Sequence, residues 1–178
     1  MASSQTSVAA AAIGFAGMLA DSDQAPRVAS KINEEASAEI PFGTMVIRGT
    51  DEEMQALQLH TSAAAVAALL AGVVVHDHSY AKDTELGTTG LKPGVTLNVL
   101  ERGHVYVLTE ETVTPGDAVR VRAVVSGNEV KGAFRTSADS TDCVNISKFA
   151  RWVKGGTTTV PAVLEIDMVG ASQAAADV

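Results

Sequence analysis

Cysteine, aromatic side chains and clustered positive charge are all scarce in this 178-residue chain. A single cysteine, Cys143, excludes an intramolecular disulfide and fits a reducing compartment, and its surroundings predict a buried thiol in a strand. The 13 Lys and Arg residues are scattered singly and are outnumbered by 21 Asp and Glu, which gives a formal net charge of −8. Because phosphate neutralisation needs clustered basic residues, this pattern argues against nucleic acid as a partner.

Long hydrophobic runs are also missing. The run VAAAAIGFAGMLA at 8–20 resembles the apolar part of a signal peptide, but no Lys or Arg occurs before Arg27. The run AAAVAALLAGVVV at 63–75 is short of the roughly 20 apolar residues that a membrane helix requires. We therefore expect no membrane segment and no membrane partner.

Short apolar stretches separated by glycine or proline turns dominate the sequence from about residue 40. They predict about eight strands, among them the valine run at 72–75 and the stretches 119–123 and 160–169, in which apolar and polar residues alternate with period two. The stretch 91–111 is interpreted as two strands joined by a turn at Glu101-Arg102-Gly103. Thr50 and Glu53 form a capping-box pattern that predicts a helical turn or two through Leu59, and 63–70 is left open as helix or loop.

The predicted fold is mainly β, a jelly-roll-like β-sandwich or small barrel with an extended N-terminal arm. The shift in composition near residue 40 divides the chain into an arm (1–39), a β domain (40–169) and a C-terminal tail (170–178). The start of the arm is rich in Ala and Ser, has no amphipathic stripe, and fits either a disordered tail or a short helix packed on its own domain. Its large apolar side chains need a partner surface: Ile13, Phe15, Met18 and Leu19.

The stretch GVVVHDHSYA at 72–81 holds the most suggestive chemistry, because His76 and His78 flank Asp77 after a run of valines. Two histidines two apart on a strand share a face and could supply half of a zinc site. The remaining ligands would have to come from His60, His104 or a carboxylate, and the pattern alone does not bring these together. We interpret the histidines as the solvent-exposed end of a strand, with a metal site at His76 and His78 as the weaker alternative.

Motifs for catalysis are missing. Neither a Gly-x-Ser-x-Gly elbow nor a cysteine-nucleophile context is present, and GTTGLKPG at 87–94 lacks the residue order of a phosphate-binding loop. Adjacent carboxylates such as Glu110 and Glu111 do not face each other, so they make poor acid–base pairs. Trp152, the sole tryptophan, is predicted to be a packing anchor or an interface residue. We expect no enzymatic activity, no catalytic residue and no cofactor.

An ordered set of blocks carries a family resemblance that extends from about residue 10 to 168. The blocks are AAAIGFAGMLADS, NEEASAEIPFGTMV, AGVVVHDHSYAKDTELGTTGLKPGVTLNVLERGHVYV, VTPGDAVRVR, GAFRTSADS and AVLEIDM. Together they resemble the structural cement, or capsid decoration, proteins of tailed bacteriophages. No single block is specific, and the order of the set carries the likeness.

The resemblance implies a non-enzymatic protein on the outer surface of the virion capsid, made in the cytoplasm of a bacterial host. Its partner would be the major capsid protein of an HK97-type head, and its own copies would associate as dimers or trimers. It would bind between major capsid proteins and stabilise the expanded shell. The residues expected at the capsid contact are Ile13, Phe15, Met18, Leu19 and Phe42.

Two other functions remain open on the sequence. The first is a metal-binding cupin-like enzyme, because the ligand motif of a cupin metal site starts with His-x-His on a jelly roll. That motif continues with a glutamate and a later histidine, and Glu85 and His104 fit these two positions imperfectly. A host-surface or carbohydrate-binding module would use a β-sandwich too, but it predicts a cluster of exposed aromatic side chains, and only 4% of the residues are aromatic.

Overall fold

The computed structural model describes residues 14–20, 25–34, 38–50, 55–58, 69–77 and 89–168. Within these ranges the regular structure is entirely β, and no helix is long and apolar enough to cross a membrane. The fold is thus the mainly β small barrel that the sequence predicts. The strands are β1 (Arg27–Asn33), β2 (Met45–Arg48), β3 (Gln55–Gln58), β4 (Leu70–Val75), β5 (Thr96–Val107), β6 (Arg120–Arg122), β7 (Phe134–Arg135), β8 (Cys143–Asn145), β9 (Ala150–Lys154) and β10 (Ala162–Asp167).

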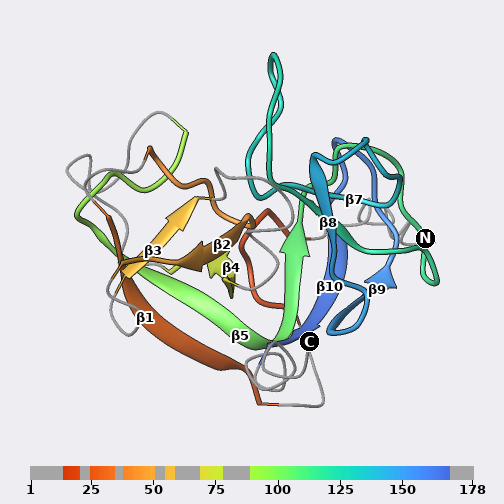
Figure 1. Ribbon diagram of the computed structural model, residues 1–178. Coiled ribbons are helices and arrows are strands. Elements are labelled where there is room, and N and C mark those ends of the chain that lie inside the picture. Colours follow the sequence, from red (N-terminus) through yellow and green to blue (C-terminus); the bar gives the residue numbers. More distant parts are fainter. Residues whose placement is uncertain are drawn as a thin grey trace, which may run out of the picture.

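A closed barrel forms the first half of the molecule. The seven-stranded sheet runs β1-β3-β2-β4-β5-β10-β9, and β1 pairs a second time with β5, which closes the five strands from β1 to β5. In Figure 1 the long ribbons of β1 and β5 run side by side along the lower edge of the molecule. A second, three-stranded sheet, β7-β6-β8, lies beside β9 and β10.

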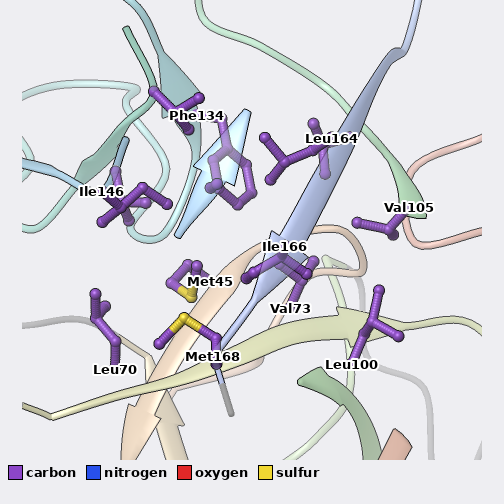
Figure 2. Close-up of a cluster of buried hydrophobic side chains, with 14 of the residues drawn as sticks. Met45, Leu70, Val73, Leu100, Val105, Phe134, Ile146, Leu164, Ile166 and Met168 are labelled. Atoms are coloured by element: carbon purple, nitrogen blue, oxygen red, sulfur yellow. The ribbon is translucent and has the colours of Figure 1, made fainter. Parts of the chain in front are cut away.

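The valine run of β4 is apolar at successive positions because both faces of this strand are buried. Val74 belongs to a cluster inside the barrel with residues of β2, β3 and β5. Val73 and Val75 point the other way, into a larger cluster that β10 and the second sheet complete. Figure 2 shows part of this larger cluster, in which Met45, Val73, Ile166 and Phe134 converge from both sheets. One core therefore joins the barrel to the second sheet.

The predicted turn at 101–103 is wrong, because β5 continues through it as one strand of 12 residues. Gly103 has φ +133°, a region that residues with side chains rarely adopt, and in Figure 1 β5 bends sharply along its length. The first half of β5 pairs with β1 and β4, and the second half pairs with β10. The glycine thus marks a bend at which the strand changes neighbours, whereas its composition is typical of a hairpin turn.

The helical turn predicted after Thr50 is also wrong where the structure describes it, because Gln55–Gln58 form β3. Thr50 donates its backbone N–H and its hydroxyl to Glu34 Oε1, at 2.6 and 2.5 Å. The strand is fixed by pairing with β2 and β1, so tertiary pairing outweighs the local capping pattern. Residues 51–54 and 59–68 lie outside the described ranges, as does the tail 170–178.

Part of the predicted arm belongs to the sheet. β1 lies within 1–39 and pairs with β5 from Arg27 to Ile32. Residues 14–20 also run along β5, and an isolated bridge joins Leu19 to Val105. The three-part division of the chain stays a prediction.

Candidate functional site

Residues 14–20 are held on the barrel by backbone hydrogen bonds from two directions. Gly17 N–H donates to the Tyr106 carbonyl at 2.8 Å, and Tyr106 N–H donates to the Met18 carbonyl at 2.9 Å. On the other side, His76 N–H donates to the Gly17 carbonyl at 2.8 Å. The backbone of this segment is thus fixed, while the side chains of Phe15, Met18 and Leu19 remain 49%, 36% and 37% exposed.

His76 lies in an aromatic cluster. Its ring packs edge-on against Phe15 with centroids 5.1 Å apart, and its centroid is 4.9 Å from that of Phe42. His78 and His60 lie outside the described residues, and the ranges that are described contain no group of three or more His, Cys, Asp or Glu placed to hold a metal. His104, from β5, contacts Glu165 at 3.2 Å. The ring of His76 thus packs against two phenylalanines.

Four of the five residues predicted to contact a partner are described, and Ile13 is outside the described ranges. Phe15 and Phe42 come together through His76, although 26 positions separate them in the sequence. Met18 and Leu19 follow Phe15 along β5. We call Phe15, Met18, Leu19 and Phe42 the arm surface. That these side chains contact a partner stays a prediction.

A cleft of about 780 Å³ adjoins the arm surface at Phe42 and Ala16. One wall is formed by residues 41–44 before β2 and a second by residues 108–111 after β5. The third is formed by residues 128–130 of the hairpin 124–132, together with Ala133 and Arg135. In Figure 1 the segment between β6 and β7 rises away from the rest of the molecule. Leu108 and Val130 line the cleft and are 45% and 42% exposed.

Six charged side chains form a cluster at this cleft. Five of them line it, and the sixth, Asp139, pairs with two of these five; the five are Arg122, Arg135, Glu110, Glu111 and Glu129. Arg122 is its centre, because its side chain is only 2% exposed and binds Glu110 with two bonds, of 2.6 and 2.7 Å. Arg122 Nη2 also lies 3.0 Å from both Glu129 Oε1 and Asp139 Oδ2. Hydrogen bonding to Glu110 raises the pKa of Arg122 above its usual value, so this buried guanidinium stays charged.

The hairpin is anchored at Gly132. Its N–H donates to the Arg122 carbonyl and its carbonyl accepts from Met45 N–H, both at 2.9 Å. Gly132 has φ +78°, and a Cβ at this position would lie 2.3 Å from the Met45 carbonyl oxygen. The close approach of two backbones therefore requires glycine here.

Gly132→Ala is expected to lower the free energy of unfolding by about 2–4 kcal/mol, because it adds left-handed strain to a backbone clash. Gly127→Ala is the matched control in the same hairpin. It also has a positive φ, +66°, but a Cβ there meets nothing within 4 Å. We expect it to cost about 1–2 kcal/mol. Urea unfolding of both variants measures the difference, and equal losses would contradict the close contact at Met45.

The contribution of Glu111 to folding stability depends on pH. Burial raises the pKa of Glu111, but hydrogen bonds from Ser137 and Thr136 and the charge of Arg135 outweigh burial and lower it below the ordinary 4.5. A group with a lowered pKa in the folded state contributes stability above its unfolded pKa, and that stability is lost as the pH falls through the folded pKa.

We therefore expect Glu111→Gln to be less stable than the wild-type protein at about pH 7 and to approach it below about pH 4. The measurement is the urea midpoint as a function of pH for both proteins. Two curves that stay parallel over the whole range would show that Glu111 does not contribute in this way.

The sequence places Cys143 in a strand and predicts that Trp152 is a packing anchor or an interface residue. The structure confirms the strand at Cys143 (β8) and places Trp152 on β9. Trp152 is 3% exposed, packs edge-on against Phe134 and donates from Nε1 to the Ala118 carbonyl, so it is a packing anchor. Cys143 is half-buried and not fully buried as predicted, and burial raises the pKa of its thiol. The charged cluster and the cleft were not predicted, because their residues come from segments far apart in the sequence.

The chain is similar to a known protein family and to a solved structure. A family model described as structural cement protein (E217 gp24/Pam3 gp6) matches residues 4–168. Among solved structures, the chain is similar to one from "The capsid of Myoviridae Phage XM1", with a TM-score of 0.60 and 12% identity over 86% of this chain and 89% of that one. At this identity the likeness shows the fold alone. The search of curated proteins found no match.

Proposed function

The chain belongs to the structural cement protein family, and from this premise we propose that it binds the outer surface of an HK97-type phage head, between major capsid proteins, and stabilises the expanded shell. Family membership itself gives the chain a structural role in a bacteriophage capsid, in association with capsid proteins. The site on the shell, the outer surface and the stabilising action are the proposal.

The observation that carries the proposal is the arm surface. Phe15, Met18 and Leu19 are each at least 36% exposed, yet their backbone is fixed against β5 and residue 76. A surface whose backbone is already ordered loses little further conformational entropy when a partner covers it. Large apolar side chains presented in this way are typical of a protein interface.

A second element of the proposal is multiplicity. We propose that copies associate as dimers or trimers, as the family resemblance implies, so that one assembly contacts several capsid subunits. Linked contacts then reinforce one another, and modest individual affinities give firm attachment. A non-enzymatic role without a cofactor belongs to the same proposal.

The test is co-sedimentation of the purified protein with undecorated capsids of its own phage, with bound copies counted per shell. We expect saturation at a fixed ratio to the major capsid protein on expanded shells and weaker binding to unexpanded ones. The ratio identifies the symmetry axis that is occupied. Failure to bind either form would overturn the proposal.

A further inference from the structure

We propose that the cleft beside the arm surface binds an extended segment of the capsid protein that carries apolar side chains and at least one lysine or arginine. This inference rests on the proposed function and adds the chemistry of the contact. It concerns a surface that is separate from Phe15, Met18 and Leu19. The cleft is lined by residues 41–44, 108–111 and 128–130 with Ala16, Thr89, Arg122, Ala133 and Arg135.

Two walls of the cleft present exposed apolar side chains. Leu108 and Val130 line the cleft from two walls and are 45% and 42% exposed, and Phe42 and Ala16 lie on its side toward the arm surface. Covering two such side chains removes apolar area from water, which favours association. An occupant with apolar side chains therefore matches the walls.

The charged cluster at the cleft contains more carboxylates than guanidinium groups. Four carboxylates surround two guanidinium groups: Glu110, Glu111, Glu129 and Asp139 surround Arg122 and Arg135. The cluster as a whole therefore carries an excess of negative charge. Glu129 lines the cleft with a side chain that is 29% exposed. Asp139 is 43% exposed and pairs with the lining residues Arg122 and Arg135, so both carboxylates are within reach of a cation that enters the cleft. A basic side chain of a partner would balance this excess.

Charge also distinguishes the capsid segment from other occupants. The stretches 1–13 and 169–178 lie outside the described ranges and contain no lysine or arginine, so neither supplies a basic side chain to the cleft. A second copy of the chain carries the same net charge of −8, which opposes close approach to an acidic surface. A basic segment of a different protein supplies the positive side chain and does not bring the acidic net charge of a second copy.

The first experiment tests the apolar walls by affinity for expanded, undecorated capsids. Val130→Glu is expected to weaken binding about tenfold or more, because it places a charge in a surface that becomes buried. Val160→Glu is the matched control, since Val160 is 48% exposed and does not line the cleft. We expect the control to bind as the wild-type protein does.

The second experiment tests the charge. Asp139→Asn is expected to weaken binding about threefold at low salt and to reduce its dependence on salt concentration. Asp167→Asn is the matched control, because Asp167 is also exposed and pairs with an arginine, Arg102, at 3.1 Å, but it lies on β10. It should leave both the affinity and the salt dependence unchanged.

The third experiment identifies the occupant. Leu108 is replaced by the photoreactive residue p-benzoylphenylalanine, the protein is bound to expanded capsids and irradiated, and the cross-linked peptide is identified by mass spectrometry. We expect a peptide of the major capsid protein with a lysine or arginine beside the cross-linked residue. A cross-link to a second copy, or to this chain's own residues such as 78–88 with Lys82, would overturn the inference.

The outcomes separate this inference from the proposed function. Wild-type protein that does not bind capsids would overturn both. Wild-type protein that binds, together with Val130→Glu and Asp139→Asn variants that bind equally well, would overturn only the assignment of the cleft and leave the arm surface as the contact.

Discussion

Arg122→Ala is expected to lower the free energy of unfolding by about 3 kcal/mol, the lower end of the range for removing one partner of a buried ion pair. Arg122 is 1% exposed and neutralises Glu110, Glu129 and Asp139 from the centre of the cluster. Without it, Glu110 and Asp139 still pair with Arg135, whereas Glu129 loses its contact with a guanidinium group. The effect stays near the lower end because these carboxylates are 19–43% exposed and are partly solvated.

Arg120→Ala is the control for this change, because Arg120 lies two residues away on β6. Arg120 Nε donates a hydrogen bond to the Thr136 carbonyl at 3.2 Å, and we expect the loss of this bond to cost about 1 kcal/mol. Urea unfolding at neutral pH measures both. Equal losses for the two arginines would contradict the central position that the structure gives Arg122.

The double variant Phe15→Ser/Met18→Ser is expected to weaken capsid binding on the order of 100-fold, about tenfold for each apolar anchor. Its effect on folding should be small, because both side chains are at least 36% exposed. The lost contact between Phe15 and His76 should cost about 1 kcal/mol.

Val153→Ser/Val160→Ser is the matched control, since these valines are 43% and 48% exposed and lie away from the arm surface. The measurement is affinity for expanded shells, with thermal unfolding of each free variant alongside. If the arm variant binds normally, the arm surface is not the capsid contact. If it unfolds at a much lower temperature than the control, the segment 14–20 belongs to the core.

The strands could be predicted from the sequence wherever one face is buried and the other is wet. Leu164 and Ile166 alternate with Glu165 and Asp167 on β10, and the structure buries the first pair and leaves the second pair partly or fully exposed. Val119, Val121 and Ala123 are all buried, as their alternation with two arginines indicates. Period-two alternation reports burial directly, so it identifies such strands without any knowledge of their partners.

The errors arose where a local signal competes with long-range pairing. Gly103 is typical of a turn, but three neighbouring strands hold β5 extended on both sides of it. Thr50 has the pattern of a helix cap, but the following residues pair with β1 and β2 as β3. The closure of the barrel by β1 was missed for the same reason, because register between distant segments leaves no trace in a short window of sequence.

The candidate site was predictable only in part. Unpartnered large apolar residues in an Ala- and Ser-rich segment gave a signal for Phe15, Met18 and Leu19. The sequence holds no signal for the burial of Arg122, because an arginine that alternates with core valines is equally typical of a solvent-facing position. The cleft joins segments around residues 42, 108 and 130, and only the folded chain brings these together.

The rupture temperature of expanded capsids, measured with increasing amounts of the protein, tests the cementing role most directly. A ligand that binds the intact shell and not the ruptured one raises that temperature as its concentration rises. We predict an increase that reaches a plateau when the sites are saturated, and a much smaller increase with Phe15→Ser/Met18→Ser at the same concentration. Saturated shells that rupture at the same temperature as bare ones would contradict the account.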